Sequence, residues 1–335
     1  MKFFGIESFL IEGTGIESSL KESPYDRLPL SSKTDVRKEV WDLSKNSAGI
    51  SIKFITNSPS ISVKWRVLNN FKMNHMPCSG IKGVDLYCKN LTGWQYVATG
   101  IPEGISNKQT LIENLSVKKR EFKLYLPLYD GIKKIEIGIQ SQYYIKKPPK
   151  STKKSIVFYG TSITQGGCAS RPGIAHTNII SRLTGFNCIN YGFSGNGRME
   201  KTIATTIAKI DTLFYVIDCL ANMTTPQVEK NTIPLVKIIR KKNTLAPIVF
   251  IENIIFKSGY FDKKIKLEIE KKNNELKTQF DKMTGCGIKN LFYIPQEYAI
   301  GRDHEGTVDG VHFNDLGFTR YADFLITNFK KIKIL

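Results

Sequence analysis

From about residue 155 onward, short apolar strands alternate with longer helical patterns, and this alternation constrains the fold more than any other feature of the chain. Consecutive strand–helix–strand units need right-handed crossovers, so the strands form a parallel sheet with helices on both faces. The predicted strands cover residues 155–160, 187–192, 212–220, 247–253 and 290–295. The predicted helices cover residues 174–184, 199–209, 226–242, 262–283 and 315–329. In such a sheet the ligand site lies beyond the carboxyl ends of the strands.

The first 145 or so residues follow a different pattern, in which short β-branched and aromatic runs are separated by Gly, Pro, Asn and Asp. Several of these runs alternate polar with apolar residues, which is typical of an antiparallel sandwich. The stretch 146–155 then places two consecutive prolines in a lysine-rich segment, where proline cannot donate to a strand ladder. We therefore predict a β-sandwich domain of residues 1–147, a linker of residues 148–154, and an α/β domain of residues 151–335 that overlaps the end of the linker.

The composition excludes several classes of protein. A chain of 335 residues with 41% hydrophobic and 24% charged residues has the balance of a globular protein with two domains. No run reaches the roughly 18 to 20 apolar residues that a bilayer crossing needs, so we predict no transmembrane segment. The formal net charge of +19 is unusual. Lysines interleave with glutamates on helical faces, as in residues 263–275, which favours a solvated basic surface over a nucleic-acid groove.

The cysteines and the N-terminus add two further expectations. The six cysteines have no CxxC spacing, so we expect neither a metal cluster nor thioredoxin chemistry, and several lie in apolar runs as small core residues. The short apolar patch in residues 1–15 is interrupted by Gly5 and Glu7, unlike the core of a signal peptide. We leave the compartment open: cytoplasmic, or periplasmic or secreted if a signal was removed.

The candidate nucleophile is Ser162, which follows the first predicted strand in the sequence Gly160-Thr161-Ser162. It would stand at the mouth of the sheet near a helix N-terminus, where the helix dipole favours developing negative charge. The segment is neither the GxSxG elbow of α/β-hydrolases nor a Walker loop. A serine that only caps a helix is the alternative.

Two more polar groups follow the second and third strands. Gly195 lies in a loop with three glycines, whose backbone a ligand could approach closely, and a plain turn is the alternative. Asn222 would bring a side-chain amide to the same mouth, unless it serves as a helix cap. We also predict that Asn196, beside Gly195, contacts the substrate.

The motif Asp309-Gly-Val-His312 supplies the remaining parts. A spacing of three lets one turn carry both groups, so that the carboxylate holds Nδ1–H of the imidazole while Nε2 faces outward. The alternative is a turn without catalytic role. His304 competes with His312 as the base, but only Asp303 adjoins it and no carboxylate lies three residues before it.

Together these residues supply what acyl transfer needs. Ser162 is the nucleophile, His312 the base that takes its proton, and Asp309 the group that stabilises the resulting imidazolium. The oxyanion would be held by the N–H groups of Ser162 and Gly195 and by the side-chain amide of Asn222.

With these residues in place, the second half of the chain resembles the SGNH/GDSL hydrolases. "FYGTSITQGG", "NYGFSGNG" and "DGVHF" look like the family's first, second and fifth blocks, and "DCLANM" lies where the third belongs. Two departures stand out: the nucleophile block reads Gly-Thr-Ser instead of Gly-Asp-Ser, and Met223 takes the place of an Asp after Asn222. The resemblance implies a serine esterase or lipase on a flavodoxin-like, three-layer α/β/α fold.

The front half resembles the GxDLY domain that precedes a subset of these hydrolases, through Gly83-Val84-Asp85-Leu86-Tyr87. That domain is a β-sandwich. The resemblance further implies a bacterial, often exported, carbohydrate-type esterase.

Our interpretation is a serine esterase that removes a short acyl group, acetyl above all, from a carbohydrate or other small ester, with no metal or organic cofactor and no specific nucleic-acid partner. His75, in a Gly/Pro/Asn-rich loop of the first domain, is a candidate substrate contact that could overhang the catalytic mouth. A histidine on a surface loop without contact to the site is the favoured alternative. A lysophospholipase or thioesterase, and a non-catalytic carbohydrate-binding protein with a decayed hydrolase domain, remain alternatives. The oligomeric state stays open.

Overall fold

The computed structural model describes all residues from 1 to 335 and has two parts, each built on its own sheets. The N-terminal part contains two antiparallel sheets, with strand orders β1-β9-β4-β7 and β10-β3-β8-β5-β6, and β2 pairs with β3 outside the second order. The strands are β1 (Lys2–Phe4), β2 (Leu10–Glu12), β3 (Ser51–Thr56), β4 (Ile61–Val67), β5 (Val84–Asn90), β6 (Gly93–Gly100), β7 (Ser106–Ile112), β8 (Arg120–Tyr125), β9 (Ile132–Ile139) and β10 (Ile145–Lys146).

The two antiparallel sheets enclose one apolar core. Alternate residues of β4 and β9, such as Val63, Trp65 and Ile137, are buried with Phe54 of β3 and Phe122 of β8. This alternation is the period of two that the sequence shows, because successive side chains of a strand point to opposite faces. The predicted β-sandwich is confirmed. Four edge strands were not predicted from the sequence because they are short or mostly polar: β1, β2, β7 and β10.

The C-terminal part contains one parallel sheet of five strands in the order β12-β11-β13-β14-β15. The strands are β11 (Ser155–Gly160), β12 (Cys188–Gly192), β13 (Thr212–Asp218), β14 (Ile248–Ile251) and β15 (Leu291–Ile294). Counted within this sheet, the order is 2-1-3-4-5, the flavodoxin-like order, with its switch point beside β11. The predicted fold class is confirmed.

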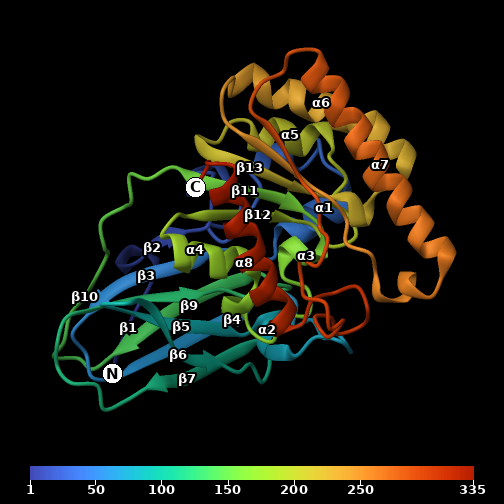
Figure 1. Ribbon diagram of the computed structural model, residues 1–335. Helices are drawn as coiled ribbons and strands as arrows, with labels where there is room; N and C mark the ends of the chain where they lie inside the picture. The colour runs from blue at the N-terminus through green and yellow to red at the C-terminus, as the bar shows by residue number, and fades with distance from the viewer.

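Helices cover both faces of the parallel sheet (Figure 1). One face packs against α5 (Lys201–Ile207), α6 (Thr225–Lys242) and α7 (Lys263–Gly285). The other face packs against α4 (His176–Thr184) and α8 (Asp315–Lys331), with the short helix α3 (Ser162–Gln165) at its end. No helix is both long and apolar enough to cross a membrane.

Residues 13–50 of the N-terminal part also cover the parallel sheet. They contain the helix α1 (Lys38–Ser44), whose buried residues Val40 and Trp41 share a core with Tyr159 of β11 and Ile189 of β12. The sequence predicted only strands before residue 145, so this helix and the helix α2 (Cys78–Lys82) correct that expectation. Their 7 and 5 residues carry too little helical periodicity to be recognised, and α1 is stabilised by its packing on the other domain.

A buried arginine joins this N-terminal segment to the parallel sheet. The Arg27 guanidinium donates to the carbonyls of Asn46, Leu43, Asn190 and Gly192, and no carboxylate pairs with it. Burial lowers the pKa of Arg27. Since carbonyls from both parts of the chain share this one donor, Arg27 fixes their relative position.

Asp85 of the GxDLY-like motif makes a second connection. Its carboxylate is fully buried and accepts hydrogen bonds from Thr99 Oγ1 at 2.6 Å, from Arg171 at 2.7 Å and from the N–H of Gly173 at 2.8 Å. Arg171 and Gly173 lie on the segment that follows α3. The motif therefore anchors that segment to the sandwich.

No helix or strand covers residues 147–154, between the end of β10 and the start of β11. This stretch contains the predicted linker 148–154. Residues 13–50 contribute to the core of the parallel sheet, so the two parts of the chain share one apolar core. The division into domains 1–147 and 151–335 therefore stays a prediction.

Replacing Arg27 with Met is expected to lower the free energy of unfolding by about 3 to 5 kcal/mol, because several buried carbonyls lose their donor together. Urea denaturation measures the loss. Arg66→Ala, at an exposed arginine of β4, is the matched control and should change stability by less than about 0.5 kcal/mol. Equal stability of the Arg27→Met and Arg66→Ala variants would show that Arg27 does not hold the two parts together.

Candidate active site

Three strand ends meet at one row of the parallel sheet. Gly160 of β11 pairs with Gly192 of β12 on one side and with Asp218 of β13 on the other. A side chain at Gly192 would bring its Cβ to 2.1 Å from the N of Gln165, so only glycine lets α3 lie against β12. The loops that carry the predicted site residues therefore start from neighbouring positions.

Ser162 is the first residue of α3, directly after β11. The Thr161 side chain caps the helix by accepting from the N–H of Ile163. The predicted alternative of a capping serine is thus excluded, since Thr161 occupies the capping position. The N–H of Ser162 has no acceptor in the protein, and its carbonyl accepts from Gly167 at 2.7 Å. The Ser162 side chain is free to take part in chemistry.

The Ser162 hydroxyl lies against the imidazole of His312. Their Oγ and Nε2 atoms are 2.9 Å apart, and His312 Nδ1 lies 2.7 Å from Asp309 Oδ2. Residues 150 positions apart in the chain thus form one continuous line of hydrogen bonds. This is the arrangement that the spacing of Asp309 and His312 predicted.

The loop that carries Asp309 and His312 is held at several points. The N–H of Val308 donates to the carbonyl of His312 at 2.8 Å, and Lys257 donates to the carbonyl of Gly310 at 2.9 Å. Behind the loop, Asn314 caps α8 by accepting from the N–H of Gly317. The imidazole is therefore presented from a short turn fixed at both ends.

The Asp309 carboxyl is ionised at neutral pH. Burial opposes its ionisation, but hydrogen bonds from the His312 ring and from the N–H groups of His312 and Val311 outweigh it and lower the pKa of Asp309 to about 2. The carboxylate therefore carries a full negative charge beside the imidazole.

The predicted oxyanion donors have free N–H groups. Gly195 has a backbone φ of +69°, and its N–H has no acceptor in the protein. Asn222 follows β13 in a 3-10 turn, where its side-chain carbonyl accepts from the N–H of Gly197 at 3.3 Å. This bond orients the Asn222 amide and leaves its NH2 group without a partner. The roles of Ser162, Gly195 and Asn222 as oxyanion donors stay predictions.

Asn196, predicted to contact the substrate, is engaged within the protein. Its side-chain carbonyl accepts from Arg37 at 2.6 Å, and its NH2 group donates to the carbonyl of Ser194 at 2.9 Å. Arg37 also pairs with Glu200. Arg37 belongs to the N-terminal segment, and no local sequence pattern predicts its contact with residue 196. Arg37 holds the loop that contains Gly195 through its hydrogen bonds to Asn196. Asn196 therefore has a structural contact that positions this loop.

The first-domain loop with His75 reaches the triad, the less favoured of the two positions that the sequence left open for this histidine. The rings of His75 and His312 lie 5.6 Å apart between centroids. Whether His75 contacts substrate stays a prediction. Cys168, to which the sequence analysis assigned no individual role, lies at the same place. Its thiol is buried, and burial, with the nearby Asp309 charge, raises the pKa of the thiol to about 12.

The other histidines lie elsewhere. His304, the competing base, packs its ring against Tyr260 at 4.6 Å, and the neighbouring Asp303 pairs with Arg320. His176 is fully buried against Phe318 and other aromatic rings. Among the four histidines, His312 is the one hydrogen-bonded to Ser162.

A carboxylate that the sequence analysis missed ends β13. Asp218 accepts from Tyr321 Oη at 2.8 Å, and Tyr321 Oη accepts in turn from Gln296. Burial raises the pKa of Asp218 to about 6. The residues around Asp218 in the sequence are those of an ordinary strand end. Its hydrogen-bond partners lie far away along the chain, so the sequence gives no sign of them.

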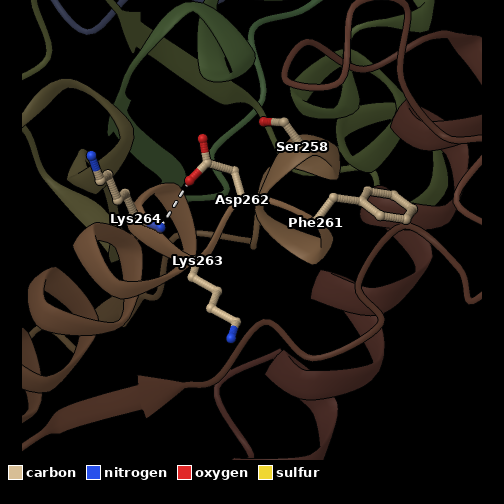
Figure 2. Close-up of a pocket in the computed structure, with 5 residues that line it drawn as sticks. All are labelled: Ser258, Phe261, Asp262, Lys263 and Lys264. Carbon is tan, nitrogen blue, oxygen red and sulfur yellow. Dashed lines mark hydrogen bonds between the residues drawn. The ribbon is translucent and has the colours of Figure 1, made fainter.

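A surface cavity of about 730 Å³ lies at the start of α7, and no residue of the triad lines it. Figure 2 shows its lining residues Ser258, Phe261, Asp262, Lys263 and Lys264. The Asp262 carboxylate is committed to capping α7, through the N–H groups of Lys264 and Ile265. These residues contain no nucleophile–base pair, so we assign the chemistry to the triad in spite of the size of this cavity.

Two family models match the chain. The model described as the GDSL-like lipase/acylhydrolase family matches residues 153–330. The model described as the N-terminus of the SGNH hydrolase-type esterases, GxDLY, matches residues 1–145. The search of curated proteins found no match.

Solved structures with the same fold include one with substantial sequence identity. A protein of Bacteroides ovatus described as a GDSL-like lipase is 36% identical, with a TM-score of 0.94 over 99% of this chain and 97% of that one. The salicylyl-acyltransferase SsfX3 of a tetracycline biosynthetic pathway is 15% identical, with a TM-score of 0.82 over 100% and 98%. An acetyl xylan esterase of Butyrivibrio proteoclasticus is 9% identical, with a TM-score of 0.60 over the full length of both chains. The last two show similarity of fold alone.

Asp218→Asn is expected to stabilise the protein at neutral pH. Folding raises the pKa of the Asp218 carboxyl from about 3.8 to about 6. Below pH 3.8 this group contributes its full stabilisation to the fold, and the contribution is lost as the pH rises through 6. The amide keeps an acceptor for Tyr321 and carries no charge. We expect a gain of about 1 to 3 kcal/mol at pH 7.5 that shrinks toward zero near pH 4.

Urea denaturation at both pH values measures this gain. Asp323→Asn, which removes an exposed carboxylate of α8, is the matched control and should change stability by less than about 0.5 kcal/mol. A gain for Asp218→Asn that is the same at both pH values would contradict the raised pKa of Asp218.

Proposed function

The chain belongs to the GDSL-like lipase/acylhydrolase family, and from that premise we propose that Ser162 carries out the hydrolysis of short acyl esters. The protein is a hydrolase of ester bonds. The proposal adds that the reaction passes through an acyl-Ser162 intermediate and that acetyl groups on a carbohydrate are the preferred substrate.

One observation carries the proposal: the unbroken line from Ser162 Oγ through the His312 ring to Asp309 Oδ2, with contacts of 2.9 and 2.7 Å. A serine hydroxyl is a weak nucleophile until a base within hydrogen-bond reach takes its proton. His312 has that reach, and the Asp309 carboxylate fixes the ring with Nδ1 as donor and Nε2 as acceptor.

In the acylation step, Ser162 Oγ forms a bond to the ester carbonyl carbon while its proton passes to His312 Nε2. The carbonyl oxygen becomes an oxyanion, for which the free N–H groups of Ser162 and Gly195 and the NH2 group of Asn222 are the donors. His312 then returns the proton to the alkoxide as the alcohol leaves, and the acyl group stays on Ser162.

In the deacylation step, water replaces the alcohol. Its proton passes to His312 Nε2 while its oxygen bonds to the acyl carbon. The bond from that carbon to Ser162 Oγ breaks, Oγ recovers the proton, and the carboxylic acid leaves. Asp309 stays ionised throughout and stabilises the imidazolium in both steps.

The surroundings of the triad support a small, polar substrate. A Cβ at Gly167 would lie 2.7 Å from Tyr129 Oη and 3.4 Å from a ring carbon of His312, so the chain closes tightly on that side of the imidazole. The His75 ring lies 5.6 Å from that of His312, and the neighbouring Asn74 is exposed. The polar groups of these two residues suit the hydroxyls of a sugar. The fold shared with an acetyl xylan esterase agrees with this substrate class.

Ser162→Ala is expected to lower kcat by about 10³- to 10⁶-fold, because it removes the atom that bonds to the acyl carbon. The assay uses p-nitrophenyl esters of graded chain length together with acetylated oligosaccharides. Wild-type protein should prefer acetyl over octanoyl esters by about tenfold or more. Ser141→Ala, at an exposed serine, is the control and should keep the wild-type rate.

Turnover that survives in Ser162→Ala would exclude Ser162 as the nucleophile. A preference for long acyl chains would instead indicate a lipase or lysophospholipase of the same family. An inactive wild type that still binds oligosaccharides would favour the non-catalytic alternative.

The double variant Ser162→Ala/His312→Ala is expected to be no slower than either single variant, within about threefold, because the two side chains act as one unit. Steady-state rates of the three variants on p-nitrophenyl acetate measure this. Independent losses that multiply in the double variant would show that another group, with His304 the first candidate, is the base.

A further inference from the structure

Three metal-ligating side chains meet beside Ser162. One ligand atom each from His75, Cys168 and His312 lies within 4.8 Å of the other two. They come from separate segments: the sandwich loop before α2, the turn after α3, and the loop before α8. No function described above uses the thiol of Cys168.

The backbone at Cys168 holds the thiol in this place. Its φ is +73°, the left-handed region that non-glycine residues seldom adopt, and the side chain is only 4% exposed. The thiol makes no hydrogen bond and no disulfide. A buried sulfur next to two imidazoles is thus free to bind a cation.

Both imidazoles are oriented for a ligand. His312 Nδ1 is held by Asp309 and His75 Nδ1 by the side-chain carbonyl of Asn74 at 3.1 Å, so each ring keeps the lone pair of its Nε2. A carboxylate or carbonyl behind a histidine is the support that ligands of zinc ordinarily have.

The spacing of the three atoms is close to that of a bound ion. Tetrahedral Zn²⁺ with Zn–S near 2.3 Å and Zn–N near 2.0 Å separates its ligands by roughly 3.3 to 3.6 Å. Closing from 4.8 Å therefore needs a movement of about 1 Å. His75 lies on a partly exposed loop that can supply it, while Cys168 is fixed.

We propose that His75, Cys168 and His312 form an inhibitory site for a thiophilic divalent cation such as Zn²⁺. The inhibitory part of this proposal rests on the proposed role of His312 as the base. On binding, the Cys168 thiol releases its proton to water and a metal–sulfur bond forms, with water completing the fourth position. The Nε2 lone pair of His312 is then donated to the ion and no longer accepts the Ser162 proton.

Titration of the wild-type enzyme with Zn²⁺ tests the inhibition. Hydrolysis of p-nitrophenyl acetate should fall to background with one ion per chain and recover with EDTA. Cys168→Ala should keep the uninhibited rate but need about 100-fold more Zn²⁺, since even a residue that only supports a ligand is worth about 10- to 100-fold in affinity. Cys286→Ala, at an exposed cysteine, should be inhibited like the wild type.

A second measurement tests the site without any catalytic activity. Co²⁺ added to the Ser162→Ala protein should give a thiolate-to-metal absorption band at one ion per chain. The band should be absent in Ser162→Ala/Cys168→Ala and weakened in Ser162→Ala/His75→Ala.

The two measurements separate this proposal from the proposed function. The absorption band without esterase activity in the wild type would support the metal site and contradict the esterase. Unchanged Zn²⁺ inhibition in Cys168→Ala, or no thiolate band, would overturn the metal site and leave the esterase standing.

Discussion

The structure depends on the register of β11 with its two neighbours. Because Gly160 pairs with both Gly192 and Asp218, three strands end at the same row of the sheet. The loops after that row carry Ser162, Gly195 and Asn222. The register alone brings these three residues together, because the carboxyl ends of parallel strands lie at the same end of the sheet. The loop that carries His312 lies between β15, the last strand of the sheet, and α8.

The N-terminal part supports this edge as well as forming its own core. Arg27 binds the carbonyl of Gly192 at the end of β12, and Arg37 holds Asn196 in the loop that follows. Asp85 anchors the segment after α3 through Arg171. Two segments of the candidate site, the loop after β12 and the segment after α3, are therefore held by the first 150 residues. A hydrolase domain without them would lack these hydrogen bonds, which gives a physical reason for the two parts to occur in one chain.

Much of this could be predicted from the sequence. Strand–helix alternation identified all five parallel strands and the helices α4 to α8, because apolar runs and helical patterns alternate regularly through this half of the chain. The spacing of Asp309 and His312 predicted their contact, since one turn sets it. What escaped prediction depends on contacts between distant segments: the packing of α1 on the sheet, the bonds of Arg27 and Arg37, the position of Cys168, and the carboxylate of Asp218. No local sequence pattern predicts these contacts.

The central claim is that Ser162, activated by His312, bonds to the acyl carbon. The most direct measurement treats the protein with a fluorophosphonate, which reacts with activated serines, and locates the adduct by peptide mass spectrometry. We expect one adduct per chain, on the peptide that contains Ser162, and none in a His312→Ala variant. An adduct on a different serine, or labelling of Ser162 that is equally fast without the imidazole, would contradict it.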